Sequence, residues 1–173
     1  MRLIELTPDQ PQYHIFCDLD GVLADFEKMA MRVIGHMPSE ADKPATNKFW
    51  KMVRAHLDAG NPFFETMEMM PDAHTLWNYL VPHNPTVLSS AGKRLTGAVE
   101  AKYSWVQQHL GVQYAKTAIF TTSAQEKAQY AGPNCILIDD RNKAIAPWVA
   151  AGGIGVLHTS AASTIKQLKE LGL

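Results

Sequence analysis

Apolar and polar positions along this chain fall into blocks that predict strands and helices in turn. Residues 13–17 form an apolar run with the length of a buried strand, and Asp18 and Asp20 follow it before Gly21. Later apolar runs predict strands over residues 86–89, 118–121, 135–138 and 154–157. Three-to-four spacing predicts helices over residues 22–35, 47–59, 97–110, 124–130 and 163–171. This alternation indicates an α/β fold with a central parallel sheet and helices on both faces.

Residues 36–72 break this rhythm and indicate an insertion. They are rich in methionine and aromatic residues, and prolines divide them at Pro38, Pro44, Pro62 and Pro71. We therefore predict an α/β core made of residues 1–24 and 73–173, and a small helical cap made of residues 25–72.

The two aspartates after the first strand are the first candidate for chemistry. Side chains alternate along a strand, so Asp18 and Asp20 point to the same side. Two carboxylates this close raise each other's pKa unless a cation or a proton lies between them. The carboxyl end of a parallel strand is also where open α/β sheets bind ligands. The alternative is a simple turn at Asp20 and Gly21, with Asp18 capping a helix.

Two later strands deliver polar groups to the same predicted edge. Ser89 and Ser90 precede a loop of small residues and then a helix, an arrangement that suits a phosphate but is also common in ordinary loops. Asp139 and Asp140 follow the strand at 135–138, and with Asp18 they offer the oxygen ligands that Mg²⁺ prefers. The alternative for this acidic pair is a capped turn.

Two lysines are candidates for neutralising a phosphate at that edge. Lys102 lies in the predicted helix after the serines, and Lys127 lies in the short helix after the next strand. Mg²⁺ does not neutralise every phosphate oxygen, so a lysine is expected nearby. Most lysines are solvated surface residues, which is the alternative for both.

Composition limits the classes of function. The chain has 173 residues and a formal net charge of −1, which suits one core with an insertion and gives no global attraction to extended nucleic acid or to a membrane. No run approaches a transmembrane helix or a signal peptide, and the two cysteines, Cys17 and Cys135, indicate no disulfide framework. We expect a cytoplasmic protein. The seven histidines show no metal-ligand spacing, and no P-loop appears.

The order of these motifs resembles a known superfamily. Asp18-Leu19-Asp20-Gly21-Val22, then Ser89, a lysine and Asp139-Asp140 resemble the four signature motifs of the haloacid dehalogenase (HAD) phosphohydrolases. Residues 20–27, 61–64, 102–106 and 137–141 resemble the 5'(3')-deoxyribonucleotidases more closely. The resemblance implies a Rossmann-like HAD core, a cap after the first strand, and a Mg²⁺-dependent phosphomonoesterase acting on (deoxy)ribonucleoside monophosphates. It also suggests a homodimer.

The resemblance implies a role for each motif residue. Asp18 is the expected nucleophile, which carries the phosphoryl group as an aspartyl phosphate, and Asp20 is the expected general acid and base. The expected phosphate ligands are Ser89, Ser90 and one or both of Lys102 and Lys127. The expected metal ligands are Asp18, the backbone carbonyl of Asp20, and Asp139 or Asp140, with a slight preference for Asp139.

Aromatic residues of the predicted cap are candidates for stacking on a nucleotide base. They are Phe49, Trp50, Phe63 and Phe64, with Phe64 preferred. The alternative is that these rings form the cap's own core.

Other functions stay open at this point. A HAD phosphatase for a phosphosugar, or for the terminal phosphate of a nucleic acid, has the same motifs. A receiver-like signalling domain shares the sheet, Mg²⁺, a phosphoacceptor aspartate, a hydroxyl and a lysine. Such a domain has no cap, however, and its acceptor lies on a middle strand, whereas here the paired acids follow the first strand.

Overall fold

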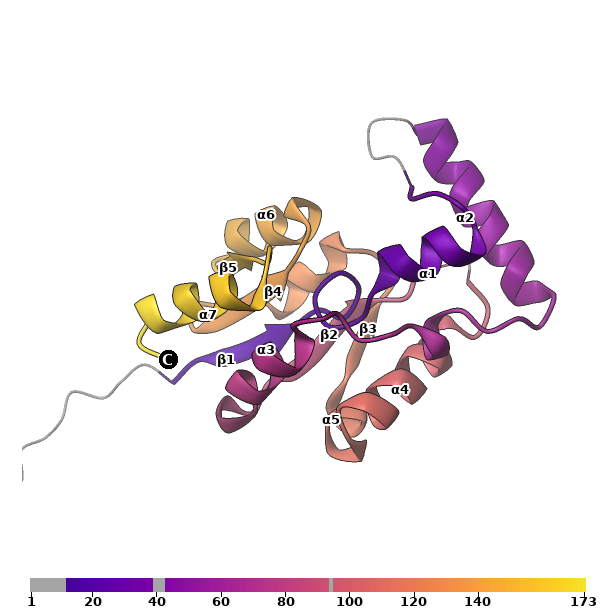
Figure 1. Cartoon of the computed structure of the whole chain (residues 1–173). Helices are drawn as coiled ribbons and strands as arrows, with labels where there is room; N and C mark the ends of the chain where they lie inside the picture. Colours follow the sequence, from indigo (N-terminus) through magenta and orange to yellow (C-terminus); the bar gives the residue numbers. More distant parts are fainter. Residues whose placement is uncertain (1–11, 39–42, 94) are drawn as a thin grey trace, which may run out of the picture.

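The computed structural model describes residues 12–38, 43–93 and 95–173 and has a five-stranded parallel sheet at its centre (Figure 1). The strands are β1 (His14–Cys17), β2 (Thr86–Ser90), β3 (Ile119–Thr121), β4 (Cys135–Asp139) and β5 (Ile154–Leu157). They lie in the order β3-β2-β1-β4-β5, and every pairing is parallel. This confirms the predicted α/β fold.

Helices cover both faces of the sheet, because its strands are apolar on both sides. They are α1 (Phe26–Val33), α2 (Lys43–Asp58), α3 (Ala73–Leu80), α4 (Ala98–His109), α5 (Val112–Thr117), α6 (Asn142–Ala150) and α7 (Ala161–Glu170), with short 3₁₀ helices η1 (Phe64–Thr66), η2 (Val81–His83) and η3 (Gln125–Tyr130). Alternation along β1 divides the core: Ile15 and Cys17 pack in one cluster, and Phe16 packs on Trp148 of α6 in the other. Within the described ranges, no helix is both long and apolar enough to cross a membrane.

The first helix begins later than the sequence pattern predicts, at Phe26 rather than at residue 22. The carbonyl of Leu19 accepts hydrogen bonds from the backbone N–H groups of residues 22, 23 and 24 at 3.1, 2.8 and 2.9 Å, which makes a tight turn after the first strand. Asp25 then caps the helix, because its Oδ1 accepts a 3.0 Å hydrogen bond from the backbone N–H of Lys28. The turn keeps residues 18–21 at the edge of the sheet.

The segment between β1 and β2 leaves the sheet and returns to it through two adjacent stretches of backbone. Asp25 N donates to Glu68 O, and Met70 N donates to Leu23 O, both at 2.8 Å. Figure 1 shows α1 and α2 projecting away from the sheet. The division into core and cap stays a prediction, and these bonds place both ends of the segment within a few residues of Asp20.

Candidate active site

The acidic residues lie at the point where the chain changes direction across the sheet. After β1, the chain builds β2 and β3 on one side, then returns to add β4 and β5 on the other. Asp18 follows β1, and its backbone N–H donates to Ile138 O of β4 at 2.9 Å. A crevice forms at such a switch point at the carboxyl ends of the strands, so this is where the fold favours a ligand.

Three carboxylates meet at this switch point. One oxygen from each of Asp18, Asp139 and Asp140 lies within 4.8 Å of the others. Burial, and then the charge of Asp18, raise the pKa of Asp139 and of Asp140 to about 7. Together the three carboxylates form a compact, strongly repelling cluster of negative charge.

Lys127, in η3, offsets part of this charge. Its Nζ lies 2.6 Å from Asp139 Oδ2 and 2.9 Å from Asp18 Oδ1. Burial alone would lower the pKa of Lys127, but Asp18 and Asp139 together raise it above its usual value. The other oxygen of Asp139 accepts a 3.0 Å hydrogen bond from the backbone N–H of Arg141, so both Asp139 oxygens are engaged.

Several buried carboxylate oxygens nevertheless have no hydrogen-bond donor in the described part of the chain. They are Asp18 Oδ1, Asp20 Oδ1 and Asp140 Oδ1, and of these Asp18 Oδ1 has the ion pair with Lys127. Leaving such oxygens unpaired is costly. An all-oxygen donor set at this spacing fits a hard divalent cation, so the residues present are compatible with the metal that the resemblance implies.

Gly21 fits the turn closely against this cluster. Its φ of +78° is in the left-handed region, and a Cβ at this position would lie 2.1 Å from Asp140 Oδ2. Only glycine has both the backbone freedom and the small size required here. The turn and the second acidic motif are therefore packed directly against each other.

A second lysine, Lys102 of α4, forms an ion pair with Asp20, the second aspartate after β1. Its side chain has no exposed area, and its Nζ donates to Asp20 Oδ2 at 2.5 Å, Ser90 O at 2.7 Å and Ser89 Oγ at 3.2 Å. Burial and the charge of Asp18 raise the pKa of Asp20, and Lys102 opposes that rise. The sequence left the choice between two lysines open, and the structure brings both into the crevice.

The two serines differ in their surroundings. Ser89 is fully buried beside Lys102, whereas the Oγ of Ser90 lies 3.1 Å from Thr121 Oγ1. Thr121 in turn donates to Ser123 O at 2.8 Å. Our sequence analysis did not single out Thr121, although it is also a polar residue at the carboxyl end of a strand.

The aromatic candidates of the predicted cap lie mostly in an interior cluster. Phe49 and Phe63 have no exposed area, and the rings of both lie about 6 Å from the ring of Phe26. Trp50 is partly buried, 5.0 Å from Phe49. Phe64 is also buried, but its ring centroid lies 5.0 Å from Lys102 Nζ. Phe64 is therefore the member of this set that contacts the acidic site.

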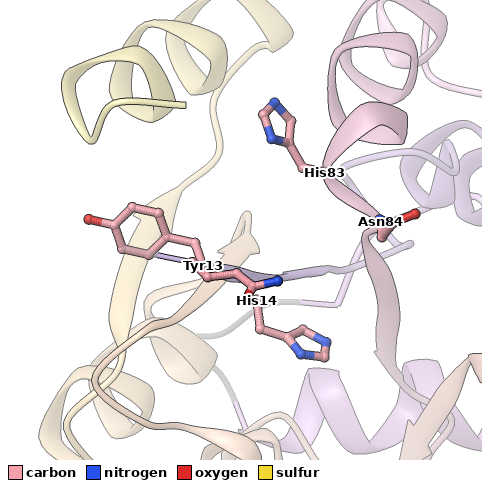
Figure 2. Close-up of a pocket in the computed structure, with 5 residues that line it drawn as sticks. Tyr13, His14, His83 and Asn84 are labelled. Carbon is pink, nitrogen blue, oxygen red and sulfur yellow. The ribbon is translucent and has the colours of Figure 1, made fainter. Parts of the chain in front are cut away.

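A separate hollow lies at the opposite, amino end of the strands. It has a volume of about 340 Å³ and is lined by Gln12, Tyr13, His14, His83 and Asn84 (Figure 2). His14 begins β1, and its Nε2 lies 3.0 Å from Thr86 Oγ1 at the start of β2. None of the described lining residues is a carboxylate, and the hollow is at the other end of the strands, so it is distinct from the acidic crevice.

Comparison with solved structures identifies the class of fold. A HAD family hydrolase from Deinococcus radiodurans, solved with bound phosphate and sodium, is 16% identical with a TM-score of 0.59, over 95% of this chain and 98% of that one. A HAD-superfamily hydrolase from Ehrlichia chaffeensis is 13% identical with a TM-score of 0.55, over 96% of this chain and 100% of that one. The fold is that of the HAD hydrolases, as the sequence motifs predicted.

Sequence comparison narrows this class. Residues 12–167 match the family model described as "5' nucleotidase, deoxy (Pyrimidine), cytosolic type C protein", and the chain belongs to this family. A human protein, "5'(3')-deoxyribonucleotidase, cytosolic type", is 30% identical over a match that covers 74% of this chain and 70% of the relative. The protein is therefore a phosphoric monoester hydrolase of the nucleotidase type.

Proposed function

We propose that the protein hydrolyses (deoxy)ribonucleoside monophosphates in a Mg²⁺-dependent reaction that passes through an aspartyl phosphate on Asp18. The observation that carries this proposal is the Asp18 and Asp20 pair at the end of β1, beside the acids of β4, in a chain of the 5' nucleotidase family. The printed name of the human relative supports the nucleotide substrate.

The metal would be held by Asp18, the backbone carbonyl of Asp20 and Asp140. We rank Asp140 ahead of Asp139 because both Asp139 oxygens already accept hydrogen bonds, whereas Asp140 Oδ1 accepts none within the described ranges. A Mg²⁺ ion bound there supplies positive charge that offsets the carboxylates and the phosphate.

The two aspartates of the first motif would divide the chemistry. The Asp18 carboxylate attacks phosphorus, and the ester P–O bond breaks while Asp20 gives its proton to the leaving oxygen. Asp20 then removes a proton from a water molecule as that water attacks phosphorus. The bond between Asp18 and phosphorus breaks, inorganic phosphate leaves, and both carboxyl groups return to their starting states.

The donor and acceptor in each hydrogen bond indicate different roles for the hydroxyls of Ser89 and Ser90. An ammonium group can only donate, so Ser89 accepts from Lys102 and keeps its own proton for a phosphate oxygen. Thr121 gives its proton to Ser123 O, so Ser90 must be the donor in its bond with Thr121. We therefore assign the phosphate contact to Ser89 and a supporting role to Ser90.

Kinetics of two matched variants test this assignment. We expect Ser89→Ala to lower kcat/KM and the affinity for inorganic phosphate by roughly ten-fold, which corresponds to one hydrogen bond to a charged group. We expect Ser90→Ala to change either value by less than about three-fold, because that hydroxyl gives its proton to Thr121. Equal losses in both variants would contradict the assignment.

Phosphate release from a defined panel tests the activity. The panel contains ribo- and deoxyribonucleoside 5'- and 3'-monophosphates, phosphosugars and a 3'-phosphorylated oligonucleotide, each with and without Mg²⁺. We expect Mg²⁺-dependent release from nucleoside monophosphates by the wild type, and no release by Asp18→Asn. Asp25→Asn, the same change at a helix cap outside the crevice, is the matched control and should retain activity.

Acid-quenched protein tests the intermediate. After single turnover of a ³²P-labelled nucleotide, the wild type should carry label that hydroxylamine removes, as an acyl phosphate does, and Asp18→Asn should carry none. Release from sugars or oligonucleotides alone would refute the nucleotide substrate, and turnover without labelled protein would refute the aspartyl phosphate.

A further inference from the structure

Lys102 is a fully buried cation with every hydrogen-bond donor in use. Its Nζ contacts Asp20 Oδ2, Ser90 O and Ser89 Oγ at 2.5, 2.7 and 3.2 Å. An ammonium group has three N–H donors, so these three acceptors account for all of them. A phosphate oxygen would have to displace one of the three in order to bind Lys102.

Lys127 is placed differently. Its Nζ has two carboxylate partners, Asp139 Oδ2 and Asp18 Oδ1, and in the described part of the chain its third N–H has no acceptor. It also lies beside the expected nucleophile rather than beside the acid. This geometry makes Lys127 the better of the two lysines for contacting a phosphate.

We infer that Lys102 is a positioning residue that orients the acid–base carboxyl of Asp20, an assignment that rests on the proposed function. The 2.5 Å contact holds Asp20 Oδ2 as a hydrogen-bond acceptor, which leaves Oδ1 as the oxygen that carries the proton. Asp20 Oδ1 accepts no hydrogen bond from the described residues, so it is free for this task. In the first step the Oδ1 proton passes to the ester oxygen, and in the second step Oδ1 takes a proton from water.

The returning segment of the predicted cap covers Lys102. The Phe64 ring lies 5.0 Å from Lys102 Nζ, close enough for a cation–π contact, and an aromatic ring there keeps water from the ammonium group. Three residues further along α4, the indole N–H of Trp105 donates to Met67 O at 2.7 Å. Lys102 is therefore held by the segment that joins the cap to the sheet, and Asp20 is held by Lys102.

A double-mutant cycle with two substrates tests this inference. The variants are Lys102→Met, Asp20→Asn and their combination, assayed on a nucleoside monophosphate and on p-nitrophenyl phosphate. Protonation of the leaving group matters for the nucleoside oxygen and little for nitrophenolate. We expect each single change to lower kcat on the nucleotide by about 10²-fold or more, the range of general acid catalysis. The loss on p-nitrophenyl phosphate should be clearly smaller.

The combined variant gives the sharper result. If Lys102 acts through Asp20, the double variant should be no slower than Asp20→Asn alone. Inhibition by inorganic phosphate should be unchanged within about two-fold in Lys102→Met, because the three N–H donors of Lys102 are used within the protein and none serves phosphate. Lys127→Met is the matched comparison, and it should weaken phosphate inhibition and slow both substrates alike.

Several outcomes would overturn the inference. They are equal loss on both substrates in Lys102→Met, weakened phosphate inhibition in that variant, and additive losses in the double variant. If Lys102→Met does not fold, Lys102→Gln keeps two N–H donors without the charge and enters the same cycle. Failure of the proposed function gives different results. The wild type would release no phosphate, or the loss in Asp20→Asn would be the same for both leaving groups. Either result would also refute the role of Lys102, because that role rests on the proposed function.

Discussion

Replacing Asp140 by asparagine should stabilise the metal-free protein. The Asp140 carboxyl lies beside Asp18 and Asp139, and its Oδ1 is buried without a hydrogen-bond donor among the described residues. An asparagine side chain would keep the shape and remove the charge. A divalent cation bound to the wild type should therefore increase its free energy of unfolding. Asp140→Asn should increase the free energy of unfolding without a cation, because the mutation removes one of the repelling charges.

The magnitude follows from the raised pKa. Burial and the neighbouring carboxylates raise the pKa of Asp140 to about 7, against about 3.9 for a free aspartate. At about 1.4 kcal/mol per unit, ionising Asp140 in the folded state costs at most about 4 kcal/mol. Because the side chain is partly exposed, solvent reduces this figure, and we expect a gain of about 1–3 kcal/mol at pH 8.

The sign of the pH dependence follows from proton counting. Between about pH 4 and 7 the folded state binds more protons at Asp140 than the unfolded state, so the contribution of this group to stability falls as the pH rises. The metal-free wild type should lose stability across this window, and Asp140→Asn should lose less. The difference between their free energies of unfolding should therefore be smaller at pH 5 than at pH 8.

Thermal unfolding at pH 5 and pH 8, with EDTA or with Mg²⁺, measures both effects. A gain of about 1–3 kcal/mol should raise Tm by several degrees at pH 8 in EDTA. Mg²⁺ should raise the Tm of the wild type at pH 8, and that of Asp140→Asn much less. Asp139→Asn is the comparison variant: the pKa of Asp139 is also raised to about 7, but removing this charge weakens the charged hydrogen bond from buried Lys127, so its gain in stability should be smaller than that of Asp140→Asn.

Two results would refute this reasoning. The first is a lower Tm for Asp140→Asn than for the wild type in EDTA at pH 8. The second is an undiminished response of this variant to Mg²⁺.

Three further changes test the packing around the site. Gly21→Ala should abolish Mg²⁺-dependent activity and lower Tm, because the new methyl group would lie 2.1 Å from Asp140 Oδ2 and φ is +78°; normal activity in this variant would contradict the close packing. Trp105→Phe removes the buried bond to Met67 O and should cost about 1–3 kcal/mol in chemical denaturation. Lys28→Ala breaks an exposed ion pair and should change stability by less than about 1 kcal/mol in the same assay.

The sequence predicted the sheet and the main site motifs because their signals are local. Each of the five strands is a short apolar run, and the polar residues follow the run directly, as Asp18 follows β1 and Ser89 ends the apolar part of β2. Parallel strands then bring their carboxyl ends to one edge without any further information. Predicting that these polar residues lie at one edge of the sheet required only the pattern of apolar and polar residues and the parallel direction of the strands.

Other features depend on packing that no local pattern records. Helices α3, α5 and α6 were not predicted, and α6 contains Pro147, a residue that usually breaks helices. Lys102 and Asp20 are 82 positions apart, so their 2.5 Å contact has no signature in spacing. Phe49 and Phe64 are the same residue type in the same segment, and tertiary structure alone places one in the interior cluster and the other over Lys102.

The adjacent ends of the segment between β1 and β2 have a consequence for how such enzymes diversify. The backbone N–H of Asp25 donates to Glu68 O, and the backbone N–H of Met70 donates to Leu23 O. The residues between these two bonds therefore form a loop whose ends are held together next to the sheet. Doubling the length of a flexible closed loop costs only about 0.6 kcal/mol in chain entropy. Insertions, deletions or exchange in the part of this segment that precedes Phe64 can therefore occur while the acids of β1 and β4 keep their places. In evolution or in engineering, that part can change independently of the bond-breaking chemistry, whereas Phe64 and Met67, which contact Lys102 and Trp105 of α4, cannot.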